Sequence, residues 1–298
     1  MHIVDKYGLY NPTMWTKKEV EDFIYSDKLR KLEKSTQNRV RTAINSLMKS
    51  LGKRDIFFPK LEEKETEVVY MSEETKKKFF EACLKEYPED GIIPFTIGIL
   101  ALKTGTRIGS DTVSRDPDIP ERDRGLSCIR IHAIDFTKKP VEFLVRDKGN
   151  YTWVKLLDEE GEKYLREYLA WREKNRPQWK TNPFLFGDIT YEDLLERMNR
   201  LRKKYDLHEL DRWGNKIRIH WHMFRDNFAN ECLLAMAGEP KEGEEPDMDR
   251  GVLACCQIGG WNDPKTFVDR YVATETINRL KKLWFRKVEN RITTGLET

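Results

Sequence analysis

Residues 61–70, LEEKETEVVY, divide the chain into two parts of different character. The segment has no helical stripe of apolar residues, and the sign of the local charge changes there. In a chain of 298 residues, such a break predicts two domains rather than one. We therefore expect a small domain over residues 1–62, a linker over 63–70 and a larger domain over 71–298.

The first part of the chain is basic. Residues 1–60 hold 13 Lys and Arg against 7 Asp and Glu, whereas the remaining 238 residues carry 41 basic and 44 acidic side chains. Nine of the basic residues fall between Lys28 and Arg54, where Glu33 is the one acid. A basic module on a near-neutral body favours nucleic-acid binding, although a solvated charged surface would show the same charge pattern.

Two helices are predicted in the small domain. Thr16 and Glu19 fit a capping box, which predicts a helix over about 17–32. Apolar residues then recur at helical spacing up to Leu51, and Gly52 ends this second helix. Four basic side chains lie largely off its apolar stripe, where we expect them to be free to meet DNA phosphates: Arg39, Arg41, Lys49 and Lys53.

The larger domain is predicted to be mostly helical with a small antiparallel β-sheet, an α+β fold. Between Leu126 and Leu157 the pattern is strand-like, in the segments SCIRIHAIDF, VEFLVRD and YTWVKLL. Polar residues 111–125 and 238–250 are predicted to be loops. Helical patterns cover residues 72–86, 92–103, 158–174, 190–205, 222–236 and 274–288.

Composition narrows the function classes. No run of eighteen apolar residues occurs and the N-terminus lacks the apolar stretch of a signal peptide, so we expect a cytoplasmic protein without a membrane span. The 5 cysteines are odd in number and form no CxxC pair, which argues against a disulfide framework and a zinc site. A GxxxxGK loop and a cluster of acidic metal ligands are also missing from the sequence, which disfavours an ATPase or a two-metal nuclease.

Six side chains of the larger domain together fit phosphoryl-transfer chemistry. Arginines offer forked donors to phosphate oxygens, a tyrosine can serve as nucleophile, and histidine and lysine can move protons. Taken singly, each has an ordinary structural explanation, and only their order and local settings distinguish them as a set. They are Arg107 in KTGTRIGS, Lys148 in RDKGNYTW, His222 and Arg225 in HWHMFRDNFAN, Trp261 in IGGWNDP, and Tyr271 in FVDRYV.

This order resembles the signature of the tyrosine recombinases, the phage-integrase family of site-specific DNA recombinases. KTGTRIG is similar to the family's T-G-x-R turn, RDKGNYTWVKLL to its lysine hairpin, HMFRDNFA to its H-x-x-R box and CCQIGGW to its L-G-H/W segment. The resemblance extends from Met71 to about Arg286. The sequence departs from the family at Ser110, where an acid is usual, and at Asp226, where a basic residue is more common.

The resemblance implies a reaction that needs no metal ion, ATP or other cofactor. Tyr271 would attack the DNA backbone to give a 3′-phosphotyrosine and a free 5′-hydroxyl. A covalent intermediate of this kind keeps the bond energy, so the strand can be rejoined without ATP. Arg107 and Arg225 would bind the non-bridging oxygens and stabilise the charge of the transition state.

The remaining roles concern protons and packing. His222 is the candidate acid–base partner, and His220 is a competitor at a less favourable spacing from the second arginine. Lys148, in a predicted hairpin turn, is the candidate general acid for the leaving 5′ oxygen. Trp261 would pack against the site and donate its indole N–H to the phosphate.

The implied partner is double-stranded DNA, bound by a homo-tetramer on two DNA sites. The predicted helices 17–32 and 36–51 resemble the latter part of the family's core-binding domain, which clamps DNA, so residues 1–62 are expected to form a helical, basic DNA-clamping domain. The predicted helix 274–288 would pass to a neighbouring subunit or pack on its own domain. A mobile element is the favoured source of such an enzyme.

Two other functions remain open. A type IB topoisomerase, which has a similar active site, would relax supercoils as a monomer. The basic N-terminal segment and the amphipathic tail favour the recombinase over it. A DNA-binding accessory protein without catalysis is disfavoured, because every expected catalytic residue type is present.

Overall fold

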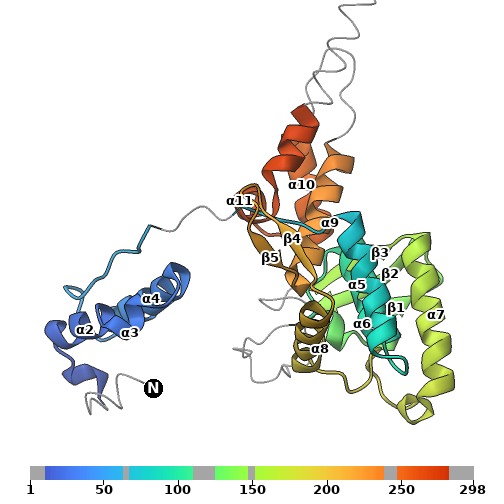
Figure 1. The fold of residues 1–298 in the computed structure, drawn as a ribbon, viewed down its shortest axis with the longest axis horizontal. Helices are drawn as coiled ribbons and strands as arrows, with labels where there is room; N and C mark the ends of the chain where they lie inside the picture. The colour runs from blue at the N-terminus through green and yellow to red at the C-terminus, as the bar shows by residue number, and fades with distance from the viewer. Residues whose placement is uncertain (1–10, 63–66, 110–124, 147–151, 238–246, 282–298) are drawn as a thin grey trace, which may run out of the picture. The chain divides into compact units, whose positions relative to one another are not determined.

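The computed structural model describes residues 11–62, 67–109, 125–146, 152–237 and 247–281. The chain forms two compact units, Met1–Thr66 and Glu67–Thr298 (Figure 1). Within the described ranges, no helix has both the length and the apolar character that crossing a membrane requires.

The small unit is helical, but its first predicted helix is broken. The expectation of one helix over 17–32 is wrong, because α2 (Lys17–Ile24) and α3 (Asp27–Arg30) are separate. The Ser26 hydroxyl accepts a hydrogen bond from the Leu29 amide at 3.4 Å and so caps the start of α3. The capping box of Thr16 and Glu19 is present at the start of α2, as predicted.

After α4 (Lys34–Ser50), the chain returns along that helix in an extended conformation. The Asn45 side chain exchanges two hydrogen bonds with the backbone of Phe58, and Asn38 exchanges two with the backbone of Leu61. Asn38, Arg41 and Asn45 lie on one helical face, because they are spaced at i, i+3 and i+7. This face therefore belongs to the fold of the small unit.

Arg41 does not lie where the sequence predicts. Its side chain is 3% exposed, and its Nη1 donates to the Pro59 carbonyl at 3.4 Å, so the expectation that it is free to meet phosphates is wrong. Lys53 is half-buried and donates to the Thr13 and Trp15 carbonyls at 2.6 Å each, so it too is engaged in the fold. Arg39 and Lys49 are exposed, as expected.

The larger unit is mostly helical with small antiparallel sheets, so the predicted α+β class is confirmed. Each predicted helix from 72–86 to 222–236 begins and ends within one residue of the expected bounds, and a helix covers residues 274–281 of the predicted 274–288. The elements are α5 (Glu73–Glu86), α6 (Ile92–Thr104), β1 (Ile134–Asp135), β2 (Val141–Arg146), β3 (Thr152–Leu157), α7 (Glu159–Asn175), α8 (Tyr191–Lys204), β4 (His208–Leu210), β5 (Lys216–Arg218), α9 (Trp221–Met236), α10 (Met248–Gly259) and α11 (Pro264–Tyr271).

The main sheet has the order β1-β2-β3, and both pairs are antiparallel. Its first strand is shorter than predicted. Within SCIRIHAIDF only Ile134 and Asp135 form a strand, because the residues before them make two 3₁₀ turns, η2 (Leu126–Cys128) and η3 (Ile131–Ala133). The strand-like pattern there reflects a single bridge, from Arg130 to Phe184.

Three elements were not predicted: the β4–β5 hairpin, α10 and α11. The predicted loop 238–250 is wrong in its last part, since α10 begins at Met248; its residues 238–246, like 111–124 of the other predicted loop, lie outside the described residues.

Helix α9 connects the two cores of the larger unit. It packs against α6 and against α10 (Figure 1). Phe224 belongs to the core formed with α5, α6 and the main sheet, and Phe228, one turn later, belongs to the core formed with α10 and α11. The side chains of α9 therefore set the relative positions of both cores.

Candidate active site

The turn that carries Arg107 is fixed by a glycine. Helix α6 ends at Gly105, which has a left-handed φ of 63°. A Cβ atom there would lie 2.3 Å from the ring of Phe228, so the position needs glycine for both its conformation and its close contact with α9. Arg107 follows two residues later and is half-buried; its carbonyl accepts from the Leu126 amide at 2.8 Å.

Arg225 lies in the middle of the site. Its side chain is 1% exposed, and its Nη1 donates to the carbonyl of Gly105. The contact joins α9 to the turn before Arg107. The guanidinium carbon also lies 4.1 Å from the centroid of the Trp261 ring and 5.5 Å from that of Tyr271. Cation–π contact in a buried setting stabilises such a pair by about 2 kcal/mol or more.

The two residues before Trp261 are glycines for different structural reasons. Gly259 is covered by the Trp261 ring, since a Cβ atom at this position would lie 1.6 Å from it. Gly260 adopts a left-handed φ of 73° and ends α10. Lys155 of β3 is 3% exposed and donates from Nζ to the Ile258 carbonyl at 3.0 Å, so the main sheet holds this turn in place.

Tyr271 is the last residue of α11, whose start is capped by Asp263. Its side chain is 5% exposed. Three rings surround it: Trp261 at 5.0 Å with the ring planes inclined at 67°, His222 at 5.4 Å, and Phe267 at 6.4 Å in a stacked arrangement. The tyrosine is thus packed between α9, α11 and the turn after α10.

A buried carboxyl lies beside this cluster. Asp226 is 6% exposed, and its Oδ1 lies 3.8 Å from Nε2 of His222. Burial raises the pKa of the Asp226 carboxyl to about 8, although the neighbouring Arg225 guanidinium opposes the shift. Asp226 is therefore largely protonated at neutral pH and adds little negative charge to the site.

The structure brings together four of the six predicted residues: His222, Arg225, Trp261 and Tyr271. Arg107 follows two residues after Gly105, whose carbonyl accepts a hydrogen bond from Arg225. Lys148 lies outside the described residues. The competitor His220 is the residue before α9, exposed, and its carbonyl accepts from the Met223 amide.

Sequence reasoning missed Lys155 and Asn230, both buried. Side chains of a strand alternate between its two faces, and Lys155 falls at a position that faces inward. That alternation is the sequence signal that could have identified it. Asn230 lies one turn after Asp226 on α9, and only its contacts, described below, distinguish it from other polar helical residues.

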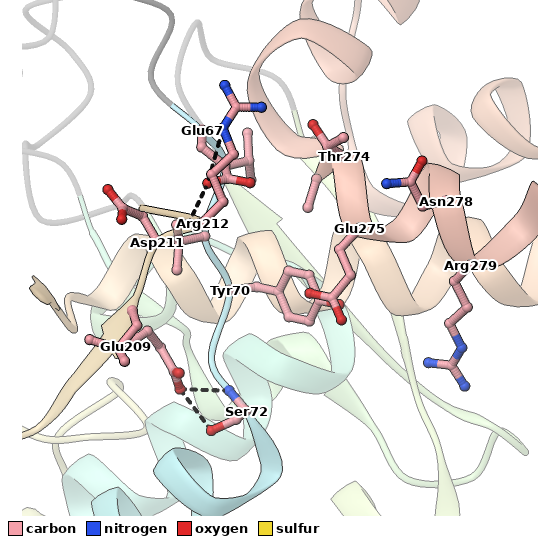
Figure 2. Close-up of a pocket in the computed structure, with 14 residues that line it drawn as sticks. Glu67, Tyr70, Ser72, Glu209, Asp211, Arg212, Thr274, Glu275, Asn278 and Arg279 are labelled. Atoms are coloured by element: carbon pink, nitrogen blue, oxygen red, sulfur yellow. Dashed lines mark hydrogen bonds and ion pairs between the residues drawn. The ribbon is translucent and has the colours of Figure 1, made fainter. Parts of the chain in front are cut away.

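A separate pocket of about 740 Å³ lies in the same unit. The end of the linker, the β4–β5 hairpin and the start of the last helix form its walls (Figure 2). Ser72 donates to Glu209 across it from both its amide and its hydroxyl. None of the five predicted residues that the structure describes lines this pocket.

A scan against models of protein families and a search of curated proteins each found no match. Solved structures do match. XerH site-specific recombinase, bound to a palindromic difH substrate in a post-cleavage complex, is similar with a TM-score of 0.58 and 14% identity, over 92% of this chain and 74% of that one.

Two further solved structures show the same likeness. Tn1549 transposon integrase in complex with transposon right end DNA matches with a TM-score of 0.54 and 14% identity, over 91% of this chain and 85% of that one. A lambda integrase tetramer bound to a Holliday junction matches with a TM-score of 0.50 and 13% identity, over 77% of this chain and 62% of that one. The chain therefore has the fold of the tyrosine recombinases and integrases.

Proposed function

We propose that this protein is a site-specific DNA recombinase or integrase that cleaves and rejoins DNA through a covalent bond to Tyr271. One observation carries the proposal: Tyr271 packs in one cluster with Arg225, Trp261 and His222, on a chain with this fold. A tyrosine beside a fixed guanidinium and an imidazole has the groups that phosphoryl transfer through a phosphotyrosine needs.

The arginines supply the charge. Arg225 and Arg107 bind the non-bridging oxygens of the scissile phosphate and stabilise the charge that develops on them. Arg225 is held by the Gly105 carbonyl and the Trp261 ring, so its guanidinium is oriented before DNA binds. A preorganised cation needs no reorganisation during the reaction, which is why such groups contribute strongly to rate.

Proton transfer falls to His222 and Lys148. His222 accepts or returns the proton of the Tyr271 hydroxyl, and its exposed ring, with 47% of the side chain accessible, can also reach solvent. Lys148 protonates the leaving 5′ oxygen. Because Tyr271 is nearly buried, its side chain rotates out of the ring cluster to attack the phosphate. Metal ions and ATP take no part.

Double-stranded DNA is the substrate. The XerH, Tn1549 and lambda structures hold DNA, and the lambda protein is a tetramer on a Holliday junction. By the same scheme, four copies of this chain act on two DNA sites. Arg39 and Lys49 of the basic small unit would contact phosphates of the DNA backbone, a role that the exposure of both side chains supports.

Covalent trapping tests the proposal. The full chain is mixed with supercoiled plasmid and with a pool of duplexes of random sequence, in EDTA and without ATP, and quenched with detergent. A protein–DNA adduct that is absent from Tyr271→Phe is the expected result. Adduct with relaxation but no strand exchange between two DNA molecules would instead indicate a topoisomerase. Tight DNA binding with no adduct would contradict the proposal and favour an accessory protein.

A further inference from the structure

Asn230 holds the chain on both sides of the tyrosine. It lies on α9 and is 1% exposed. Its amide Nδ2 donates to the carbonyl of Tyr271 at 2.8 Å and to that of Asp226 at 2.7 Å. Its Oδ1 accepts from the Ala273 amide at 2.9 Å and from the Thr276 hydroxyl at 2.6 Å. A single side chain thus contacts α9, the end of α11 and the start of the helix over 274–281.

These four hydrogen bonds use the full capacity of an asparagine amide, which has two donor hydrogens and two acceptor lone pairs. The partners also fix the orientation of the amide. Two carbonyls face the nitrogen, while an amide and a hydroxyl face the oxygen, so a flipped side chain would put donors against donors. No other common side chain of this size matches the arrangement, because an aspartate lacks the donors and a leucine lacks both.

The position of Asn230 on α9 gives these contacts a functional consequence. The same helix presents His222 and Arg225, two and just over one turn earlier. The nucleophile belongs to a different element, α11, whose end is held by the contact with Asn230. Asn230 therefore fixes the distance between the backbone of the nucleophile and the helix that carries the phosphate-binding and proton-transferring groups.

We propose that Asn230 is a positioning residue for the attack by Tyr271, an inference that rests on the proposed function. It anchors the backbone at residues 271–273 while the tyrosine side chain remains able to rotate towards DNA. It also links this backbone to Thr276, so the start of the following helix and the nucleophile share one anchor. Misplacing a reacting group by about 1 Å costs about 10²-fold in rate, which sets the size of the expected effect.

Asn227 provides a matched control. It is a second asparagine on α9 and is also 1% exposed. Its Nδ2 donates to the Met71 carbonyl at 2.7 Å, and its Oδ1 accepts from the Met71 amide at 2.9 Å. Its amide therefore ties the same helix to the start of the larger unit and not to the segment around Tyr271. Aspartate at either position keeps the shape and one acceptor but removes the donor.

The experiment compares Asn230→Asp with Asn227→Asp in the full chain, using the duplex pool that the wild-type protein binds. Three quantities are measured: DNA affinity, the rate of covalent adduct formation at saturating DNA, and hydrogen exchange at the Ala273 amide. We expect Asn230→Asp to slow adduct formation by about 10-fold to 100-fold with affinity nearly unchanged, because the donors to the Tyr271 and Asp226 carbonyls are lost. The Ala273 amide keeps its acceptor, so its exchange should speed only because residues 271–273 are no longer anchored through the Tyr271 carbonyl. Asn227→Asp should leave both close to wild type.

Equal losses of adduct rate in both variants would overturn the inference, because they would reflect a general weakening of α9. Wild-type rate and exchange in Asn230→Asp would overturn it as well. If Asn230→Asp does not fold, Thr276→Val removes one of the four bonds with little change in shape; a slower rate supports the inference and an unchanged rate overturns it. Absence of adduct from the wild-type protein is a different result, since it contradicts the proposed function itself.

Discussion

The guanidinium of Arg225 lies on the face of the Trp261 indole, 4.1 Å from the ring centroid to Cζ. The arginine is on α9 and the tryptophan follows α10, so the contact joins two helices as well as two residues. Trp261 is 6% exposed, and its Nε1 has no hydrogen-bond partner among the residues that the structure describes. Since a buried indole N–H normally finds an acceptor, this one is suited to meet a DNA phosphate.

Trp261→Phe tests that role. Phenylalanine keeps an aromatic face for Arg225 but has no N–H, so the fold should be retained while the phosphate loses one donor. A hydrogen bond to a charged group contributes about 1.5–3 kcal/mol, which corresponds to a fall in adduct formation of about 10-fold to 100-fold. The measurement is the adduct rate of a variant whose thermal unfolding matches wild type. An unchanged rate would show that the indole only packs.

Arg225→Lys should reduce cleavage by about 10²–10³-fold, because lysine keeps the charge but loses the forked donors. Arg172 of α7 offers a control. It is 8% exposed and donates from Nη2 to the Trp179 carbonyl at 2.7 Å, away from the candidate site. Arg172→Lys should lower stability without a matching loss of adduct formation by the folded protein. Wild-type cleavage by Arg225→Lys would contradict the assigned role.

Asp226→Asn should make the protein more stable at neutral pH. Burial raises the pKa of Asp226 to about 8, against about 3.9 in an unfolded chain. Below pH of about 4 both states are protonated and the group has no effect. Between about pH 4 and 8 only the unfolded chain releases the proton, so the free energy of unfolding falls as pH rises, by up to about 1.4 kcal/mol per pH unit.

The check is denaturant unfolding of both proteins across this pH range. Arg225 and His222, the charged and titratable groups that face Asp226, are present in both, so the difference between the two curves isolates the carboxyl. The advantage of the variant should grow with pH and level off above about pH 8. A difference that shrinks as pH rises would contradict the prediction.

Arg39→Ala and Lys49→Ala should each weaken DNA binding without loss of stability, because both side chains are exposed. Each lost phosphate contact should reduce the slope of log affinity against log salt by about 0.9. Arg41→Ala should behave in the opposite way. Its buried contacts with Pro59 and the ring of Tyr25 predict a destabilisation of about 1–3 kcal/mol. Salt titrations and melting curves of the three variants distinguish the two outcomes.

Gly105→Ala should destabilise the larger unit by more than a left-handed φ alone explains. An L-residue in that region costs about 1–2 kcal/mol, and overpacking against Phe228 adds about 1–3 kcal/mol. Gly214 is the control, because it has a φ of 80° and a Cβ atom there would meet no described atom within 4 Å. Equal effects of Gly105→Ala and Gly214→Ala on unfolding would show that Phe228 moves aside at little cost.

The sequence predicts most helices of the larger unit well, because they form long segments that are either amphipathic, as in α8, or apolar throughout, as in α6. It fails where a local hydrogen bond overrides the helical pattern, as at Ser26, whose hydroxyl starts a new helix. It also fails for α10 and α11, which are separated by the turn that begins at Gly260.

The candidate site was predicted by residue type and order, but its contacts were not. That Arg225 is held by the Gly105 carbonyl depends on the packing of α9 against α6. The burial of Arg41 has a similar origin, since the segment that covers it returns from beyond the helix. Contacts between residues distant in sequence carry no periodic signal, so a pattern within one segment cannot reveal them.

The pairing of Met71 with Asn227 has a consequence for biosynthesis. Its two hydrogen bonds span 156 residues of sequence. A chain that leaves the ribosome from its N-terminus can complete the small unit early, because domains fold as units during synthesis. The larger unit cannot close until α9 has emerged, and Tyr271 follows later still. On the proposed function, a nascent chain would therefore carry its basic first unit long before the residue proposed to cut DNA has emerged.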